Sequence, residues 1–345
     1  MKLEKTPKIS VIMSVYNSDR FLKDSIDSIL RQTFSDFEFI ITDDKSSDSS
    51  LSVLEEYAKK DGRIVLLKNL ENMGLTKNLN GMIRIAKGKY IARLDADDIS
   101  LPERLWLQHD FMENHPETGV LGTDGKIFGD NRKTITINRP ETNEEIRAAF
   151  LFENLLIHSS AFIRKSVLDE HNIGYDENFR IIQDLELWTR MTAVTGFHIL
   201  PQALTLYRVS DTNISTTTER KDNYRESVLK DIYATYLSAN NFKFSRDQAD
   251  IHVIMLHKRK ITDKNITSKI EEWLLHLQSE NIRTKSFDES YFRYMISKHW
   301  YKSCTRSTSL GAELIYRYFR SELHKGYNPG FIILIRFILK CLIRY

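Results

Sequence analysis

Cysteine, net charge and long uninterrupted apolar runs are all scarce in this chain of 345 residues. Its two cysteines, Cys304 and Cys341, are too few for a disulfide framework and lack the spacing of metal ligands, so a reducing compartment is expected. Lys plus Arg number 50 against 47 Asp plus Glu, a formal net charge of +3, whereas a general nucleic-acid binder usually carries a strong basic excess. We therefore expect no nucleic-acid partner. The N-terminal MKLEKTPK leads into a short apolar run without a small-residue cleavage site, so no signal peptide is expected.

The first third of the chain alternates short apolar runs with segments of helical period. The pattern predicts strands over 8–17, 37–44, 63–69 and 89–98, and helices over 18–33, 49–61 and 75–88. Strand–helix repetition with short loops predicts an α/β domain, Rossmann-like, with a mostly parallel sheet flanked by helices. From about residue 216 helix-period segments continue to the end. We expect an α/β catalytic domain over 1–215 and a C-terminal α-helical domain over 216–345.

Polar and aromatic side chains gather where three of these strands end. The first ends in SVYN (14–17), the second in TDDKS (42–46) and the fourth in DADD (95–98). Parallel α/β sheets bind ligands in the crevice beyond the carboxyl ends of their strands. The three ends therefore predict one crevice lined by an aromatic ring, a pair of carboxylates and an acidic cluster.

The acidic cluster indicates a metal site, because carboxylates this close repel one another unless a cation lies among them. Asp95 and Asp97 flank one residue, so on an extended chain both side chains point to the same side and offer hard oxygen ligands to Mg²⁺ or Mn²⁺. The competing interpretation is a solvated turn or a helix that starts at Asp98 or Ser100. An EF-hand loop is excluded, since Ser100 and Trp106 stand where it needs Gly and Glu, and no glycine-rich run forms a P-loop. An aspartyl-phosphate phosphotransferase would usually carry such a pair on its N-terminal strand, whereas here the pair falls on the fourth predicted strand.

Eight ordered motifs lie within residues 7–215: SVIMSVYN, SILRQTFSDFEFIITDDKSSD, NMGLTKNLN, GKYIARLDADDISLPERL, HSSAFIR, GYDENF, QDLELWTR and LYRVSDTNIS. Together they resemble the family 2 glycosyltransferases of GT-A fold, bacterial enzymes that often build surface polysaccharides. No single motif is decisive, but their joint order and spacing are specific.

The resemblance implies a donor site at the strand ends. Tyr16 packs on the nucleotide base and Asp44 accepts a hydrogen bond from it, with Asp43 as a weaker candidate. Asp95 lies near the ribose and the metal, and Asp97 is the direct ligand of Mn²⁺ or Mg²⁺. The implied donor-binding residues are Val15, Tyr16, Asn17, Asp44, Lys77, Asp95, Ala96 and Arg208. Without the resemblance, each residue also fits an ordinary structural role. Tyr16 could belong to the core, Asp43 and Asp44 to a capped loop, and Lys77 to the solvated face of a helix.

The motif QDLELWTR supplies the acceptor side. Inverting glycosyl transfer needs one base to take the proton of the attacking hydroxyl, and the resemblance assigns that role to Asp184. The family usually has Glu before this Asp, whereas this chain has Gln183, which should leave the pKa of Asp184 less raised. The alternative role for Asp184 is a helix N-cap. Ser210 replaces a family histidine, while Arg208 remains to pair with phosphate oxygens or to form a structural ion pair. His158, in an apolar setting, is expected to be structural.

The last stretch, GFIILIRFILKCLIRY (330–345), is apolar but interrupted by Arg336, Lys340 and Arg344 at a spacing of four. It is too short and too charged to span a bilayer. The pattern favours an amphipathic interfacial helix with its apolar side in the lipid boundary. The competing interpretation is a helix that folds back onto the protein or into a dimer.

These observations predict a metal-dependent, inverting glycosyltransferase. We expect a UDP-sugar donor, a saccharide or lipid-linked saccharide acceptor, and a role in capsule or O-antigen assembly at the cytoplasmic face of the membrane. One alternative is a sugar nucleotidyltransferase, which would favour a glycine-rich phosphate loop near the N-terminus that SVYNSDRF lacks. The other is a non-catalytic, membrane-associated scaffold of the same fold.

Overall fold

The computed structural model describes residues 6–129, 134–137, 139–209 and 222–344. The chain divides into two compact units, which are described separately below. Unit 1 comprises residues 1–146 and 154–222, and unit 2 comprises residues 147–153 and 223–345. The predicted boundary at 215/216 falls within residues 210–221, outside the described residues.

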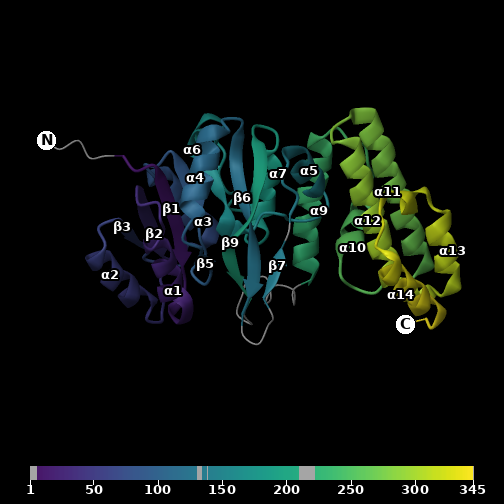
Figure 1. Ribbon diagram of the computed structural model, residues 1–345, viewed down its shortest axis with the longest axis horizontal. Coiled ribbons are helices and arrows are strands. Elements are labelled where there is room, and N and C mark those ends of the chain that lie inside the picture. Colours follow the sequence, from purple (N-terminus) through teal and green to yellow (C-terminus); the bar gives the residue numbers. More distant parts are fainter. Residues whose placement is uncertain (1–5, 130–133, 138, 210–221, 345) are drawn as a thin grey trace. The chain divides into compact units, whose positions relative to one another are not determined.

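Unit 1 contains one sheet, in which nine strands are seen among the described residues (Figure 1). Its strands are β1 Ile9–Val15, β2 Phe37–Asp43, β3 Ile64–Lys68, β4 Tyr90–Arg93, β5 Ile99–Ser100, β6 Thr118–Phe128, β7 Ile135–Ile137, β8 Phe162–Arg164 and β9 Gly196–Arg208. They are ordered β3-β2-β1-β4-β8-β6-β9-β5, with β7 paired to β6. The pairs among β3, β2, β1 and β4 are parallel, and so is β6 with β9. The expected mostly parallel α/β sheet is confirmed, and β5, β7 and β8 add antiparallel pairs.

Helices connect the parallel strands and cover the sheet. The helices of this part of the chain are α1 Asp19–Leu30, α2 Ser50–Lys60, α3 Leu75–Ile85, α4 Arg104–Asn114, α5 Asn143–Ala149, α6 Lys165–Glu170 and α7 Gln183–Met191, with a short 3₁₀ turn, η1, at His158–Ser160. In α1, Leu22, Ile26 and Ile29 are buried at helical spacing. Each such side chain contributes roughly 2 kcal/mol when it leaves water. The period read from the sequence thus corresponds to the core face of the helix.

The predicted strand over 89–98 is wrong at its C-terminal end. β4 stops at Arg93, and the following residues form a turn in which the Asp98 amide donates to the Asp95 carbonyl at 3.3 Å. The next residues form the short strand β5, and a helix begins only at Arg104. The acidic cluster therefore lies on a turn between two strands, where extended-chain alternation does not decide the direction of its side chains.

Unit 2 is helical in its described residues. Its helices are α9 Asp222–Ala239, α10 Arg246–Leu256, α11 Lys264–Thr284, α12 Glu289–Arg306, α13 Ala312–Arg320 and α14 Phe331–Leu342, with 3₁₀ turns η2 Thr308–Leu310 and η3 Glu322–Gly326. The core includes the fully buried Trp273 and Trp300. Trp273 donates its indole N–H to Nδ1 of His252 at 3.0 Å, and Nε2 of this imidazole donates to the Leu151 carbonyl at 2.8 Å. No helix among the described residues is both long enough and apolar enough to cross a membrane.

Candidate functional site

The carboxyl ends of β1, β2 and β4 lie at one edge of the sheet, because these strands are parallel and adjacent. Val15, the buried last residue of β1, pairs with Asp43 at the end of β2, and Ile12 pairs with Arg93 at the end of β4. Tyr16 follows directly, and 52% of its surface is exposed. This edge therefore presents an open aromatic face next to the polar strand ends.

Asn17 ties the loop after β1 to the loop after β2. Its Oδ1 accepts a hydrogen bond from the Ser47 amide at 2.8 Å, and its own amide donates to Oγ of Ser46 at 3.1 Å. Its φ of 49° is in the left-handed region, which Asn tolerates better than most residues. The two loops beside Tyr16 are thus held together before any ligand binds.

Asp43 and Asp44 are both buried, but their carboxylates have different surroundings. Asp44 Oδ1 accepts from the Met73 amide at 2.8 Å and from Nδ2 of Asn69 at 2.7 Å, and its Oδ2 accepts from the Gly74 amide at 2.9 Å. A carboxylate has about four acceptor positions, so roughly one remains on Asp44. Asp43 accepts one hydrogen bond on Oδ2, while its buried Oδ1 has no partner among the described residues.

The turn after β4 brings three carboxylates together. Oxygen atoms of Asp95, Asp97 and Asp98 lie within 4.8 Å of one another. Asp95 forms a two-pronged ion pair with the buried guanidinium of Arg93, whose Nη1 donates to Oδ2 at 2.6 Å and whose Nη2 contacts Oδ1. The Ser159 hydroxyl lies within hydrogen-bond distance of both Asp95 and Asp98. Arg93 therefore balances one of the three charges, and Ser159 bridges the other side of the cluster.

Asp97 and Asp98 are the two carboxylates of the cluster that Arg93 does not pair. Burial and the neighbouring Asp95 charge raise the pKa of Asp97 to about 6, and the same two causes raise the pKa of the fully buried Asp98 well above its usual range. Among the described residues, no other residue donates a hydrogen bond to the Asp97 carboxylate. Three close carboxylate oxygens, one of them on an unpartnered side chain, are a donor set that fits Mg²⁺ or Mn²⁺.

Arg208, the last residue of β9, closes the other side of the acidic turn. Its amide donates to Asp98 Oδ1 at 2.7 Å, and its Nε donates to the Asp97 carbonyl at 2.8 Å. The guanidinium carbon lies 4.0 Å from the ring centre of Phe21 and 4.4 Å from that of Phe128, so the side chain is held between two aromatic faces. This arrangement places Arg208 beside the metal candidates and fixes the direction of its guanidinium.

Asp184 occupies the first turn of α7 and keeps part of its surface exposed. Its Oδ2 accepts a hydrogen bond from Nδ2 of Asn154 at 2.6 Å. Burial raises the pKa of Asp184, and the hydrogen bond from Asn154 opposes part of that rise. Ile182, which precedes the helix, has a φ of 59°, which is a strained conformation for a β-branched residue. Such backbone strain tends to occur at functional sites.

Arg93 connects the acidic turn to Asp184. Burial raises the pKa of both Asp97 and Asp184, and the positive charge of Arg93 opposes part of each rise and also acts on His158, so both carboxylates lie in the field of one buried cation. His158 Nε2 lies 2.7 Å from the Tyr175 hydroxyl, and burial holds the pKa of this imidazole well below its usual range. A neutral histidine paired with a buried tyrosine agrees with the expected structural role.

Two predicted residues contribute no side-chain hydrogen bond or ion pair to the site among the described residues. Lys77 is exposed on the first turn of α3 and makes no ion pair with the described residues. Ala96, within the acidic turn, is buried and adds only backbone to the site. Ser210, which replaces the family histidine, lies outside the described residues.

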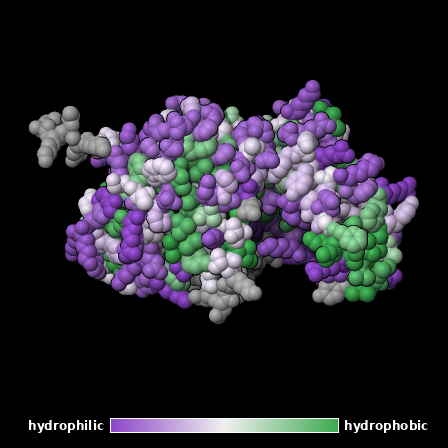
Figure 2. All heavy atoms as spheres, in the orientation of Figure 1, coloured by the Kyte–Doolittle hydropathy of each residue, from purple (hydrophilic) through white to green (hydrophobic). Residues whose placement is uncertain are grey.

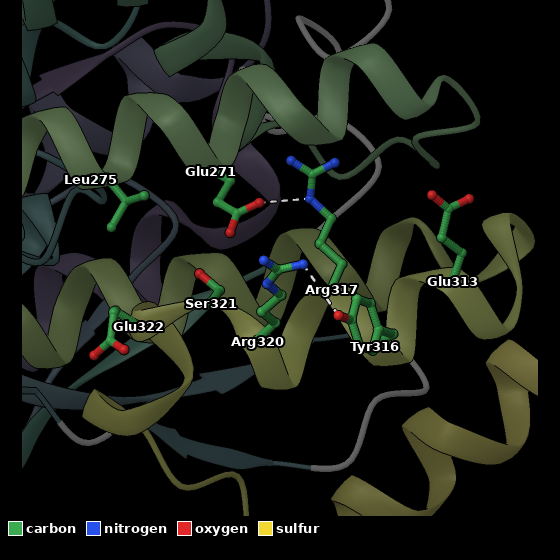
Figure 3. Close-up of a pocket in the computed structure, with 8 residues that line it drawn as sticks. All are labelled: Glu271, Leu275, Glu313, Tyr316, Arg317, Arg320, Ser321 and Glu322. Atoms are coloured by element: carbon green, nitrogen blue, oxygen red, sulfur yellow. Dashed lines mark hydrogen bonds and ion pairs between the residues drawn. The ribbon is translucent and has the colours of Figure 1, made fainter.

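A cavity of about 440 Å³ lies in unit 2, lined by residues of α11, α13 and the start of η3 (Figure 3). Arg317 in its wall pairs with Glu271 at 2.6 Å, and Arg320 donates to the Tyr316 hydroxyl at 3.2 Å. Glu313 and Glu322 add two further carboxylates. These two carboxylates pair with Lys264 and Lys325, so the charged groups of the cavity already have partners, and we assign no chemistry to it.

Four residues of the site were missed by the sequence analysis: Arg93, Asp98, Ser159 and Asn154. A signal was present for two of them, since Arg93 interrupts the apolar run YIARL and Asp98 belongs to DADD. Ser159 lies in the motif HSSAFIR without an assigned role and Asn154 lies in the mainly apolar LFENLL, so only their contacts with distant carboxylates identify them.

Comparison with known proteins gives two kinds of similarity. Residues 10–171 match the family model described as glycosyl transferase family 2. The chain is 35% identical over 243 residues to an uncharacterised glycosyltransferase, MJ1057, of Methanocaldococcus jannaschii, covering 69% of this chain and 80% of the relative. It is 33% identical over 192 residues to the O-antigen biosynthesis glycosyltransferase WbnJ of Escherichia coli, covering 55% of this chain and 74% of the relative.

Two solved structures share the fold. Staphylococcus aureus TarS 1–349 in complex with UDP superposes with a TM-score of 0.55 at 19% identity, over 91% of this chain and 92% of that one. The mannosyltransferase PcManGT from Pyrobaculum calidifontis, in complex with GDP-Man and Mn²⁺, gives 0.53 at 14% identity, over 94% and 86%. At these identities the likeness concerns the fold alone, and it confirms the expected GT-A architecture.

Proposed function

The chain belongs to glycosyl transferase family 2, and on that premise we propose that it transfers a sugar from a UDP-sugar to a saccharide or lipid-linked saccharide, with inversion at the anomeric carbon. The observation that carries this proposal is the acidic turn, in which carboxylate oxygens of Asp95, Asp97 and Asp98 lie within 4.8 Å of one another at the carboxyl end of β4. The acidic turn with Asp97 and the partly exposed Asp184 both lie in the field of Arg93. One group suits a donor diphosphate with its metal, and the other suits a hydroxyl that must lose a proton.

The donor base is assigned to the edge formed by β1 and β2. The exposed Tyr16 ring offers a stacking face, and Asn17 fixes the loops beside it. Asp44 has about one acceptor position left for a base N–H, since its other positions hold the 69–74 loop. TarS is described in complex with UDP, which supports a uridine nucleotide. Val15 supplies backbone at this edge, and Lys77 is proposed as a neighbour of the diphosphate.

Asp97 is proposed as the principal ligand of Mn²⁺ or Mg²⁺, with Asp95 and Asp98 beside it. The three close carboxylates support this assignment, and the PcManGT complex contains Mn²⁺. When bound, such an ion supplies positive charge that stabilises the departing diphosphate. Arg93 holds Asp95 in place by pairing both of its oxygens, and Arg208 holds the turn by its bonds to Asp97 and Asp98.

Asp184 is proposed as the general base. The acceptor oxygen forms a bond to the anomeric carbon while the bond from that carbon to the phosphate oxygen breaks, and the hydroxyl proton passes to Asp184. Asn154 donates to Oδ2 of this carboxylate and the backbone N–H groups of Asp184 and Leu185 also act on it, so we assign the acceptor hydroxyl to an acceptor position that remains on Oδ1. A pKa raised by burial brings the base closer to the operating pH, where proton transfer is most effective.

UDP release from a panel of UDP-sugars, with Mn²⁺ and with chelator, tests the proposal. Asp184→Asn should bind UDP as the wild type does but lose transfer by about 100-fold or more, the usual contribution of a general base. Asp110→Asn, an exposed aspartate on α4, is the matched control and should be unaffected. If Asp184→Asn weakened UDP binding instead, the carboxylate would belong to the donor site and not to the acceptor side.

A parallel incubation with UTP and a sugar 1-phosphate separates the alternatives. Release of pyrophosphate in that incubation would support a sugar nucleotidyltransferase, and release of neither UDP nor pyrophosphate would support a non-catalytic scaffold. We further propose that the reaction takes place at the cytoplasmic face of the membrane in capsule or O-antigen assembly, which the similarity to WbnJ supports.

A further inference from the structure

The C-terminal helix α14 is docked on unit 2 by one narrow face. Phe337 and Cys341, one helical turn apart, are buried, and the Phe337 ring contacts the rings of Tyr301 and Tyr318. The Tyr301 hydroxyl also donates to the Ile333 carbonyl at 3.4 Å. The helix is therefore fixed in orientation, and the remainder of its surface faces away from the unit that holds it.

That remaining surface is mainly apolar. Phe331 has 79% of its surface exposed and Ile332 has 67%. Ile333 is also exposed but falls between Lys340 and the buried Phe337 on the helix, and the other exposed apolar residues are Phe331, Ile332, Ile335, Leu339, Leu342 and Ile343. At about 100° per residue they form one continuous arc, which is separate from the buried face. Figure 2 shows hydrophobic atoms gathered over this end of unit 2. Soluble proteins rarely expose such a contiguous patch unless it meets a partner.

Basic side chains border this apolar arc, and acidic ones are absent from the sequence around it. Arg336 and Lys340, one turn apart on the helix, are both exposed. No Asp or Glu occurs between residues 323 and 345. The helix thus combines a lipophilic face with a positively charged edge.

The geometry points to an anionic lipid bilayer as the occupant of this surface: we propose that α14 lies in the membrane interface, with Phe331, Ile335 and Leu339 in the acyl boundary and Arg336 at the headgroups. Interfacial helices bind in this way, by apolar burial together with attraction to anionic lipids. A second copy of the chain fits less well, because a two-fold interface sets the same patch against itself and would bring the two positively charged edges close to each other. This inference rests on the proposed function and deepens it, because a membrane-bound enzyme suits the proposed lipid-linked acceptor.

Sedimentation with vesicles tests the surface directly. The full chain is mixed with vesicles of phosphatidylcholine alone, or of phosphatidylcholine and phosphatidylglycerol in equal parts, with no nucleotide sugar present. The wild type should co-sediment with the mixed vesicles and more weakly with the neutral ones. The double variant Ile335→Glu/Leu339→Glu should bind at least about tenfold more weakly, because two carboxylates would enter the acyl boundary. Arg336→Gln should weaken binding to the mixed vesicles only, by about fivefold.

Ile282→Glu is the matched control, since Ile282 is an exposed apolar residue on α11 of the same unit. It should bind both vesicle types as the wild type does, and all variants should keep the wild-type circular dichroism and thermal midpoint. Equal binding by the double variant and the wild type would overturn the inference. So would a wild type that ignores vesicles and is instead a dimer that the double variant dissociates.

The two proposals fail separately. UDP release without vesicles should be the same for the double variant and the wild type, since α14 belongs to unit 2 and the proposed chemistry to unit 1. Vesicle binding without sugar transfer would support the membrane-binding helix and contradict the proposed activity. Sugar transfer without vesicle binding would support the activity and contradict the membrane-binding helix.

Discussion

Replacing Asp97 by Asn should stabilise the metal-free protein at neutral pH while it removes metal-dependent transfer. The Asp97 carboxylate is largely buried beside Asp95, and these two causes raise its pKa from 3.8 to about 6. A pKa difference of roughly 2 units between the folded and unfolded states corresponds to about 3 kcal/mol of destabilisation by the ionised group. Asn has nearly the same shape and no charge, so the variant should recover much of that free energy of unfolding.

The dependence on pH gives the prediction its sign. Because the folded-state pKa is the higher one, the wild type gains stability from Asp97 as pH falls through about 6 toward 3.8. The advantage of Asp97→Asn should therefore be largest above about pH 7 and shrink to nearly zero near pH 4. Mn²⁺ should also reduce the stability advantage of Asp97→Asn, because the bound cation offsets the repulsion between Asp97 and Asp95 in the wild type only.

Urea unfolding in chelator, followed by tryptophan fluorescence at several pH values, measures the difference. Asp110→Asn is the control, since Asp110 is an exposed aspartate on α4 of the same unit. A variant less stable than the wild type at neutral pH in chelator would refute the reasoning, because the carboxylate would then be stabilising by itself. A variant that keeps full metal-dependent activity would instead remove Asp97 from the metal site.

Three further expectations concern other parts of the chain. Asn154→Ala should move the acid limb of the pH–rate profile for transfer to higher pH, because the ionised Asp184 loses its 2.6 Å donor, and an unchanged limb would show that Asn154 has no influence on the base. Burial lowers the pKa of His252 to about 4, so the free energy of unfolding should fall by about 3 kcal/mol as the pH is lowered from 6.5 to 4. Urea titrations of the wild type and of His252→Phe would compare this loss. Gly88→Ala should lower the thermal midpoint by an amount equivalent to about 1–3 kcal/mol, because its Cβ would lie 2.4 Å from a backbone nitrogen of β1, whereas Gly62→Ala, with no atom within 4 Å, should be nearly neutral.

Local patterns in the sequence were sufficient for the framework. The four parallel strands and their three connecting helices follow from apolar periodicity, and the boundaries were placed within a few residues except at 89–98. The edge of the sheet that carries Tyr16, Asp43 and the acidic turn follows from the parallel order alone. Local periodicity encodes these features because it states which face of each segment must leave water.

The partners within the site depended on contacts between distant residues. Ser159 meets the acidic turn from 61 and 64 residues away, Asn154 meets Asp184 from 30, and Arg208 meets Asp98 from 110. Asp44 also depends on distant contacts, because its carboxylate accepts hydrogen bonds from the amides of Met73 and Gly74. None of these pairings leaves a period or a motif in the sequence, because each is fixed by how whole strands and helices pack.

The C-terminal helix illustrates the same division between sequence and structure. Its amphipathic character, with cations four residues apart, was determined by the sequence alone. Only the tertiary structure decided that Phe337 and Cys341 are the residues that face the protein and that Ile335 and Leu339 stay exposed. A sequence determines how much apolar surface a segment must hide, but which part of it is hidden depends on the shape of the surface that the rest of the chain presents.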